Sequence, residues 1–214
     1  MQSVFASLPG FLYATWLTIE IAVLVILLSW GFGLVAALGK RSRIAILRVP
    51  CDLYIWFVRG TPAMIQIFAV YFGLPQFGIS MSPFVAGVIT LSLNSGAYVA
   101  EIIRGGLMAI PKGQYESPIA LGLSHAQSFR RIILPQVARI ILPAITNEAV
   151  ATLKNTSLLS VITVVELTFH AQIVIAKTFQ PFQFYILAAL IYLLLTTLLT
   201  RASALLEARN AVRS

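Results

Sequence analysis

Five apolar runs, each long enough to cross a membrane as a helix, constrain the fold of this chain more than any other feature. A membrane-spanning helix needs about 20 mostly apolar residues in succession. Hydrophobic residues make up 59% of the 214 residues and charged residues 10%, against roughly 45–50% and about 25% in an ordinary soluble domain. The sequence therefore predicts an all-α integral membrane protein, with residues 1–214 in a single transmembrane domain. The predicted spans are about 12–38, 53–75, 83–107, 137–165 and 182–205.

The basic residues are sorted to one side of these five spans. Thirteen of the 15 lysines and arginines lie after the first span, between the third and fourth spans with their helix ends, or in the C-terminal tail. Because cytoplasmic segments carry an excess of lysine and arginine, this pattern places the N-terminus outside and the C-terminus in the cytoplasm. The net charge of +8 is thus a topology signal and predicts no nucleic-acid partner. The 13 are Lys40, Arg41, Arg43, Arg48, Arg59, Arg104, Lys112, Arg130, Arg131, Arg139, Arg201, Arg209 and Arg213.

Residue counts exclude several kinds of catalytic site. One cysteine, two histidines and one aspartate leave almost no material for a metal site, a disulfide framework or a Ser-His-Asp triad. A phosphate-binding loop needs Gly, four residues, and then Gly-Lys-Ser/Thr. The nearest string, residues 33–41, has the wrong glycine spacing and an arginine after the lysine. We therefore expect no metal, no cofactor and no ATP hydrolysis in this chain.

Three connections carry further expectations. Residues 73–83 form a turn-rich outer loop without charge, and residues 170–181, which include His170, are predicted to form a second outer loop. Arg59 is expected to mark the cytoplasmic boundary, with Pro62 starting an uninterrupted helix. Residues 44–57 mix apolar and charged side chains, so they form either an amphipathic elbow along the inner interface or the first turns of a tilted span.

The longest cytoplasmic connection, about residues 108–136, is predicted to be a small structured unit. A short helix is expected over about 115–122, with Pro118 in its first turn, where a missing N–H costs little. Gly122 ends that helix, as glycine commonly does. A second helix starts near Ser124.

This unit carries a recognisable motif. Glu116 and Gly122, followed after nine residues by Ile132, Leu134 and Pro135, match the spacing of the "EAA" loop of ABC importer permeases. The two alanines of that pattern are replaced here by serine and proline. Residues 59–62 (Arg-Gly-Thr-Pro) and 153–158 (Leu-Lys-Asn-Thr-Ser-Leu) resemble segments of polar amino acid permeases of the histidine, glutamine and arginine importer type.

The resemblance covers nearly the whole chain and implies a type I ABC importer permease fold. It implies a dimer of five-span subunits, either identical or related, in the cytoplasmic (inner) membrane of a bacterium. It also implies a cytoplasmic ABC ATPase dimer that carries ATP and magnesium, and an external or periplasmic solute-binding protein. The function it implies is import of polar amino acids by alternating access.

The short loop helix is predicted to dock on the ATPase. A four-residue spacing puts Tyr115, Ile119 and Leu123 in one apolar stripe, and Gly122 permits a sharp turn. Glu116 could cap its own helix or pair with a basic residue of the partner. A structured loop without a partner is the alternative reading of these features. The predicted coupling residues are Tyr115, Glu116, Ile119, Ala120, Gly122 and Leu123.

Polar side chains inside the spans suggest a substrate site, because hydrocarbon penalises ionisable groups. Glu148 and Lys154 are six residues apart, about 9 Å along a helix axis, which is too far for a direct pair but suited to bracketing a zwitterion. Alternatively, both residues join helices as structural contacts. The predicted substrate-binding residues are Asn94, Tyr98, Glu148, Lys154, Asn155 and Ser157.

Other features of the spans have structural interpretations. Glu101 and Arg104 are expected to form a structural pair, and the small residues 95–97 permit close helix approach. Glu20 and His170 receive no role. Two other functions stay open: an ion-coupled secondary amino acid carrier that uses Glu148 and Lys154, and a structural membrane subunit of another complex. Such carriers usually contain internal repeats, and none is convincing here.

Overall fold

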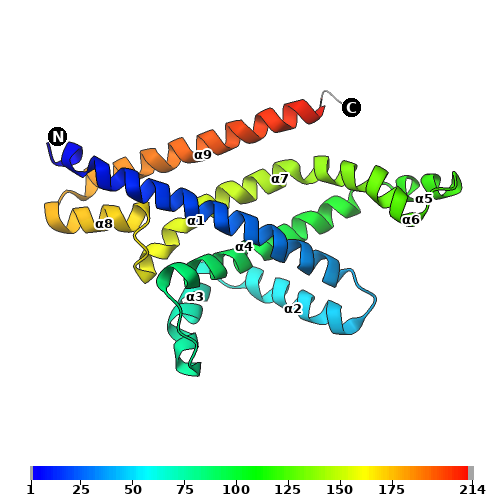
Figure 1. Ribbon diagram of the computed structural model, residues 1–214, viewed down its shortest axis with the longest axis horizontal. Coiled ribbons are helices and arrows are strands. Elements are labelled where there is room, and N and C mark those ends of the chain that lie inside the picture. Colours follow the sequence, from blue (N-terminus) through cyan, green and yellow to red (C-terminus); the bar gives the residue numbers. More distant parts are fainter. Residues whose placement is uncertain (1, 212–214) are drawn as a thin grey trace.

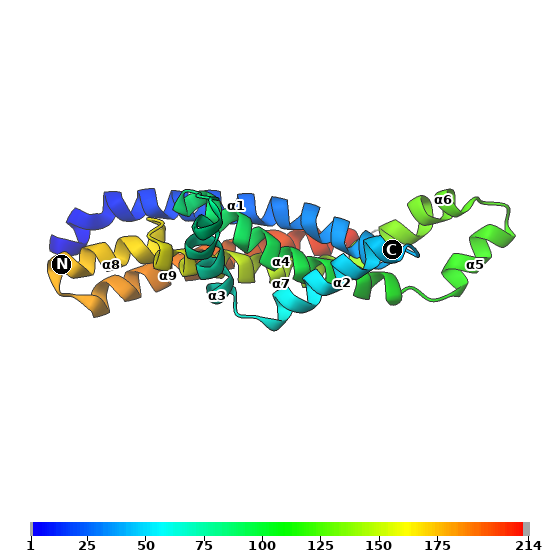
Figure 2. The ribbon, with the colours of Figure 1, turned by 90° about the horizontal axis from the view of Figure 1, so that it is seen from below.

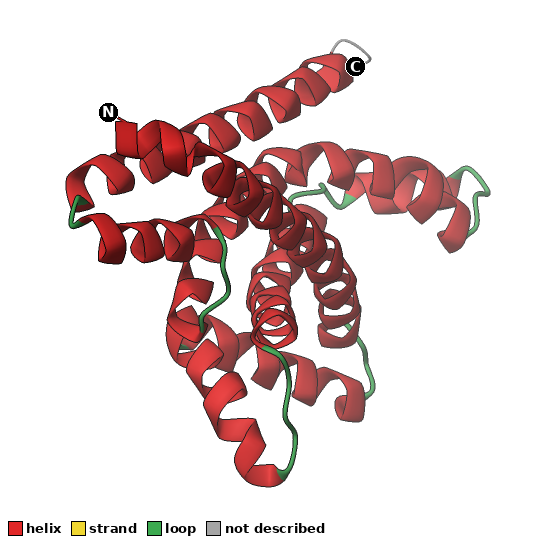
Figure 3. Ribbon diagram, turned by 60° about the vertical axis from the view of Figure 1, so that its left-hand side comes forward, coloured by secondary structure: helices red, strands yellow, loops and turns green. Residues whose placement is uncertain are grey.

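The computed structural model describes residues 2–211, and it describes side chains over residues 7–205. Over the described residues the fold is entirely helical, and short loops join the helices (Figures 1 and 3). The α-helices are α1 Gln2–Lys40, α2 Ala45–Gly60, α3 Ala63–Phe68, α4 Pro83–Met108, α5 Gly113–Ala120, α6 His125–Ser128, α7 Leu134–Asn155, α8 Leu167–Thr178 and α9 Pro181–Ala211. Four segments of tighter or wider turns extend α3 and α7: π-helical Ala69–Gly73 and 3₁₀ Leu74–Phe77 after α3, π-helical Phe129–Ile133 before α7, and 3₁₀ Thr156–Ile162 after α7.

The number of spans agrees with the sequence prediction when bent helices are counted together. Residues 7–40, 83–108 and 181–205 are each long and apolar enough to cross a membrane. Two further helix pairs pass the same test jointly, but they bend by 112° between α2 and α3 and by 47° between α7 and α8. The described residues therefore contain three straight candidate spans and up to five in all.

The second span bends at the residues just before Pro62, and the helix that starts after Pro62 runs without a break from Ala63 to Phe77, as predicted. Its α-helical part ends at Phe68, and the helix continues as π-helical and 3₁₀ turns. Residues 45–60 form a helix of their own that meets this segment at 112°. Of the two readings for residues 44–57, the structure favours the elbow. Proline causes the break, because it disfavours helical backbone in the preceding residue, and Thr61 is extended.

Residues 170–181 were predicted to form an outer loop. Most of them, up to Thr178, belong to helix α8, so this prediction was wrong. The Glu166 carboxylate caps this helix by accepting hydrogen bonds from the backbone N–H groups of Thr168 and Phe169, at 2.8 and 2.9 Å. Glutamate is not among the strongly preferred N-cap residues, which explains why the helix start was missed. His170 lies inside α8, where its ring meets Phe11 of α1 edge-on at 4.9 Å between centroids.

The long helices run along one axis and place the chain ends apart. In Figure 1 the described N-terminal end lies at one end of the long axis, the α5–α6 hairpin lies at the other, and α9 ends on the side of the hairpin. The C-terminal ends of α1, α4 and α9 and the start of α7 all lie toward that second end, where α5 and α6 project as a hairpin (Figure 2). Lys40 at the end of α1 and Arg130 and Arg131 just before α7 therefore belong to the half of the molecule that carries the hairpin, and the orientation of the chain in a membrane stays a prediction.

Helix α4 forms the centre of the fold. About 67% of its membrane-spanning window is buried, compared with 39% for α1 and 11% for α9. The predicted close approach occurs where α1 crosses α4: a Cβ on Gly33 would lie 2.5 Å from Cγ1 of Val99 and 3.0 Å from the carbonyl oxygen of Gly96. Polar residues on α4 consequently face other helices rather than lipid.

Candidate functional site

A line of polar side chains runs along the buried helix α4. Asn94, Ser95, Tyr98 and Glu101 follow one another from the middle of the span toward the end that carries the basic residues. Asn94 and Ser95 are 6% and 4% exposed. Since buried polar groups are costly without partners, each of these side chains identifies the helix against which it packs.

Asn94 bonds to a residue that the sequence reasoning did not single out. Its amide Nδ2 donates to Oε1 of Gln66 on α3 at 3.0 Å. The Gln66 amide in turn donates to the carbonyl oxygens of Val58 and Thr61, at 2.8 and 3.1 Å, and to the Thr61 hydroxyl at 2.7 Å. Gln66 thereby satisfies backbone groups that the break between α2 and α3 leaves free. The signal in the sequence that could have identified Gln66 is that it is an isolated amide in the apolar stretch after Pro62.

Ser95 connects α4 to α7. Its hydroxyl donates to Oε1 of Glu148 at 2.7 Å and lies 3.0 Å from the Thr152 hydroxyl. Glu148 is half-buried, whereas Thr152 is 2% exposed. The structure thus brings a carboxylate and two hydroxyl groups together between two spans.

The predicted substrate residues are only partly assembled. Asn94, Tyr98 and Glu148 lie on the facing helices α4 and α7, whereas Lys154 is exposed and forms no ion pair with any side chain the structure describes. Asn155 is the last residue of α7, and the Ser157 hydroxyl donates to the Lys154 carbonyl oxygen at 2.8 Å. The Glu148 carboxylate contacts Ser95 of another helix. This agrees with the alternative reading of the sequence, in which Glu148 joins two helices as a structural contact. As a substrate site, the six residues stay a prediction.

The structural pair predicted for Glu101 and Arg104 is confirmed, and it belongs to a larger cluster. Arg104 holds the Glu101 carboxylate with its Nε and Nη2 atoms at 2.8–3.1 Å. Lys40 of α1 and Arg59 of α2 reach the same carboxylate at 3.1 and 3.5 Å, and Lys40 also pairs with Asp52 at 3.2 Å. One carboxylate therefore joins α1, α2 and α4.

Arg59 also contacts the polar line on α4. Its guanidinium carbon lies 5.4 Å from the ring centroid of Tyr98, within the range of a cation–π interaction. Arg59 therefore connects the elbow helix α2 to both Tyr98 and Glu101, and its place at the cytoplasmic boundary stays a prediction.

The segment between α4 and α7 forms the predicted helical hairpin with a shifted start. Helix α5 begins at Gly113, so Pro118 lies in its interior and not in its first turn as predicted; it is buried there. Gly122 has φ +88°, the left-handed conformation that favours glycine. Ser124 and Gln127 form a reciprocal capping box that starts α6, as predicted.

The hairpin presents an incompletely covered surface. The Tyr115 hydroxyl donates to the Leu107 carbonyl oxygen at 3.0 Å and ties α5 to the end of α4. Ile119 is 39% exposed, Leu123 is half-buried, and Ala120 and Glu116 are exposed. Glu116 forms no ion pair with any described residue. A crevice of about 510 Å³ between α5 and α6 is lined in part by Tyr115, Glu116 and Ile119.

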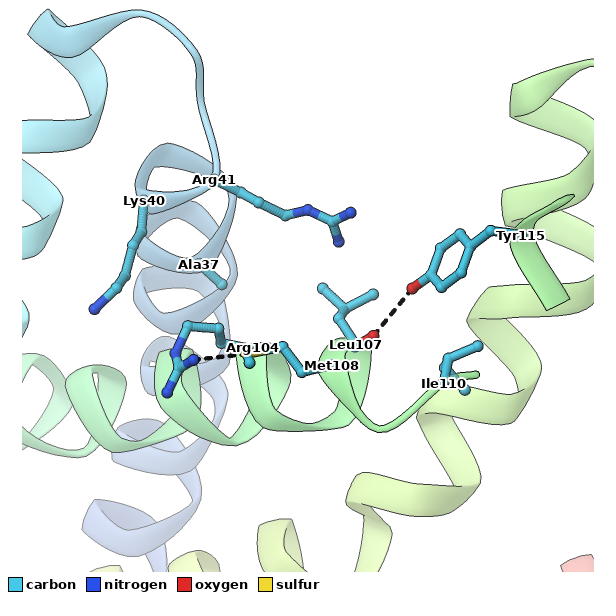
Figure 4. A pocket seen from close by; sticks show the side chains of 8 residues that line it. All are labelled: Ala37, Lys40, Arg41, Arg104, Leu107, Met108, Ile110 and Tyr115. Carbon is cyan, nitrogen blue, oxygen red and sulfur yellow. Dashed lines mark hydrogen bonds between the residues drawn. The ribbon is translucent and has the colours of Figure 1, made fainter. Parts of the chain in front are cut away.

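Two cavities lie along α4, and one of them adjoins the end where this hairpin begins. One, of about 460 Å³, lies between the ends of α1 and α4 and the start of α5 (Figure 4). The other, of about 340 Å³, is lined by apolar residues of α1, α4 and α7. Over the described residues no group of three or more His, Cys, Asp or Glu side chains could hold a metal ion.

Known proteins resemble this chain over most of its length. Residues 29–212 match the family described as "Binding-protein-dependent transport system inner membrane component". The chain is 43% identical over 179 residues to the probable amino-acid ABC transporter permease protein YckA of Bacillus subtilis (strain 168), covering 84% of this chain and 79% of the relative. It is 36% identical to the L-cystine transport system permease protein TcyB of the same organism, covering 97% and 88%.

Solved structures agree with this assignment. The crystal structure of an amino acid ABC transporter with histidines contains a chain that superposes with a TM-score of 0.92 at 38% identity, with 97% of each chain covered. A structure of the MetNI methionine ABC transporter in an inward-facing conformation shares the fold, with a TM-score of 0.70 at 15% identity over 98% of this chain and 97% of the other. With the helical topology, the hairpin and these matches together, the chain belongs to the family of binding-protein-dependent transport system inner membrane components, as a transport permease subunit.

Proposed function

We propose that this chain is the membrane-spanning permease of an ATP-driven importer for polar amino acids. A separate ABC ATPase, which carries ATP and magnesium, supplies the energy. The permease alternates between outward-facing and inward-facing states. It works as a multi-pass protein of a bacterial cytoplasmic membrane, with the N-terminus outside and the α5–α6 hairpin in the cytoplasm.

One observation carries the proposal: the two helices that flank the α5–α6 hairpin also hold the buried polar cluster, which consists of Asn94, Ser95, Glu148 and Thr152. Helix α4 contributes Asn94 and Ser95 and then leads into α5, whereas α7 follows α6 and contributes Glu148 and Thr152. Each is a continuous helix of more than 20 residues. A displacement of the hairpin would therefore be transmitted along both helices to the contact between Ser95 and Glu148.

The hairpin has the properties of a docking element for the ATPase. Its exposed face offers apolar Ile119 and an unpaired carboxylate at Glu116. The left-handed backbone at Gly122 sets the turn between its two helices. Tyr115 anchors it to the last turn of α4, so force applied to α5 reaches the span directly.

The other partners are inferred from the family, from the exposed apolar surface of the helices and from the proposed orientation of the chain in the membrane. A second permease subunit, identical or related, would cover membrane-facing surface such as α9, of which only 11% is buried. An external or periplasmic solute-binding protein would deliver substrate at the end opposite the hairpin. Membrane lipid would cover the rest of the apolar surface.

Both the chemistry of the polar side chains in the spans and the transport systems of related permeases favour amino acids as substrates. Glu148 can accept the substrate ammonium in exchange for the Ser95 hydroxyl, while Asn94, Tyr98, Asn155 and Ser157 supply uncharged polar contacts. The exposed Lys154 remains available for a carboxylate. Relatives include permeases of L-cystine and octopine transport systems, as well as putative glutamine transport system permeases.

Reconstitution tests this function directly. The full-length chain would be purified with its ATPase and placed in liposomes, with the solute-binding protein added outside. We expect amino acid uptake that requires ATP inside the vesicle and ATP hydrolysis that substrate-loaded binding protein stimulates. Uptake driven by a proton or sodium gradient without ATP would instead establish the ion-coupled carrier. A complex that transports nothing, with or without ATP, would favour a structural subunit.

A further inference from the structure

The cavity between the ends of α1 and α4 is not used by the proposed transport mechanism. Its walls combine the apolar side chains of Ala37, Leu107, Met108 and Ile110 with basic side chains and Tyr115 of α5. It lies at the boundary between the apolar spans and the hairpin, the position of a phospholipid headgroup in the cytoplasmic leaflet. Met108 at its rim is 71% exposed. A ligand here would meet apolar and positively charged surface at once.

Of the three basic residues that line the cavity, one is available to a ligand. Lys40 is paired with Glu101 and Asp52. Arg104 is paired with Glu101 and also donates from Nη1 to Sδ of Met108 at 2.8 Å (Figure 4). Arg41 instead extends across the gap toward Tyr115 (Figure 4). Arg41 is exposed and pairs with no carboxylate over the described part of the chain.

The charge balance around the cavity favours an anion. Three cations, Lys40, Arg41 and Arg104, line the cavity, and two of them pair with the carboxylates of Glu101 and Asp52, so the group has a net positive charge. A single free guanidinium matches one phosphodiester, because it can donate two parallel hydrogen bonds to the phosphate oxygens. The surplus of positive charge would repel the ammonium of a zwitterionic headgroup. Basic pockets between helices on the cytoplasmic side of a membrane commonly bind anionic lipid headgroups.

From these contacts we infer that the cavity is a binding site for an anionic phospholipid of the cytoplasmic leaflet, such as phosphatidylglycerol, with Arg41 holding its phosphate. The acyl chain runs along Leu107 and Met108. Arg41 and Tyr115 also line the crevice between α5 and α6. A lipid phosphate on Arg41 therefore bridges the end of α1 and the coupling hairpin.

Direct lipid binding tests the site without any transport. The full-length chain, in the complex it forms, would be exposed in detergent to equal amounts of phosphatidylglycerol and phosphatidylcholine, and the bound lipids would be counted by native mass spectrometry. We expect preferential retention of phosphatidylglycerol and about a tenfold loss of that preference in Arg41→Gln, equivalent to one charged contact. Arg43→Gln is the matched control: it removes the same charge from an exposed residue two positions away that does not line the cavity. It should keep the preference.

A second pair of variants addresses the cavity itself. Met108→Glu places a carboxylate at the rim and should abolish the preference, whereas Met108→Gln, of similar size, should retain it. Equal losses in Arg41→Gln and Arg43→Gln would overturn the site, because they would indicate general surface attraction. Displacement of the lipid by millimolar inorganic phosphate would overturn the lipid assignment in favour of a free anion. Loss of the ATPase from Arg41→Gln with unchanged lipid retention would likewise overturn it. A negative result would leave the proposed transport function standing, because none of these measurements depends on uptake.

Discussion

The Ser95 hydroxyl of α4 donates a 2.7 Å hydrogen bond to the Glu148 carboxylate of α7, which joins two residues 53 positions apart in the sequence across the interface of two spans. Both helices lead directly to the α5–α6 hairpin. The hairpin is the element that is proposed to receive the force of ATP hydrolysis, and this hydrogen bond lies between the two helices that would transmit it. The role of the bond can be tested with substitutions that leave the fold intact.

Removing the charge of Glu148 should reduce transport without preventing assembly. In Glu148→Gln the side chain keeps its size and can still bond to Ser95, but it loses the negative charge that would bind a substrate ammonium. A hydrogen bond to a charged group is worth about 1.5–3 kcal/mol, so uptake at low substrate concentration should fall by about 10-fold to 100-fold. Radiolabelled amino acid uptake in proteoliposomes measures this.

Glu20→Gln is the control for that variant. Glu20 is exposed on α1 and has no ion pair over the described residues, so this change should have little effect on uptake. Normal uptake by Glu148→Gln, with unchanged substrate dependence, would return Glu148 to a purely structural role.

Gly122 should be sensitive to any side chain because of its backbone and not because of a steric clash. A Cβ there would meet nothing within 4 Å, but φ is +88°. Forcing an L-residue into the left-handed region costs roughly 1–2 kcal/mol, so Gly122→Ala should shift the hairpin turn. We expect normal membrane insertion with ATP hydrolysis partly uncoupled from uptake.

The comparison for Gly122 is Gly113→Ala. Gly113 also has open space around its Cβ position, but its φ is not in the left-handed region. Coupling should be preserved in this variant. The ratio of ATP hydrolysed to substrate imported distinguishes the two, and equal ratios would contradict the role assigned to the turn.

The crossing of α1 and α4 should tolerate no larger residue at Gly33. A Cβ there would lie 2.5 Å from Cγ1 of Val99 and 3.0 Å from the Gly96 carbonyl oxygen. Overpacking of this kind costs about 1–3 kcal/mol, so Gly33→Leu should lower the thermal unfolding temperature in detergent. A Cβ at Gly31, two residues away, would meet nothing within 4 Å, so Gly31→Leu should unfold like the parent. Similar unfolding of both variants would argue against the close crossing.

Glu101 should matter more for stability than the other acidic residue of its cluster. Its side chain is 15% exposed and binds Lys40, Arg59 and Arg104. Its three partners are 29–43% exposed, so the cost of removing the shared carboxylate should lie between the roughly 0–1 kcal/mol of an exposed ion pair and the about 3–5 kcal/mol of a buried one. Glu101→Gln should therefore be measurably destabilised in detergent unfolding experiments.

Asp52→Asn provides the contrast within the same cluster. The Asp52 side chain is 44% exposed and pairs with Lys40 alone. Ion pairs at exposed positions contribute about 0–1 kcal/mol, so this variant should unfold close to the parent. A loss at Asp52 equal to that at Glu101 would mean that the cluster does not centre on Glu101.

The features that could be predicted from the sequence are those that depend on a local stretch of chain. Long apolar runs predicted the spans because lipid selects for mean hydropathy over about 20 residues. Gly122 and Ser124 predicted the hairpin because a glycine end and a serine cap act within one helical turn. The pair of Glu101 and Arg104 was predictable because three residues separate them on one helix.

Breaks and bends in the helices were harder to predict. Glu166 starts α8 although glutamate is a weak signal for a helix start, and Tyr192 of α9 secures it through a 2.8 Å hydrogen bond to the carboxylate. The partner 26 residues away makes this cap stable, and no local pattern contains it. Gln66 is similar, since its bond to Asn94 depends on how α3 folds back against α4.

The sequence by itself determined the helical membrane fold, the sorting of the basic residues and the coupling motif, because hydropathy, charge at helix ends and turn chemistry act over short stretches of chain. Only the tertiary structure decided the partner of Glu148. Lys154 lies on the same helix, six residues away, whereas Ser95 comes from another span, and the packing of α4 against α7 placed Ser95 within hydrogen-bonding distance. Buried polar groups bond to whatever the packing brings near them, and in this chain the packing of helices distant in sequence decides that.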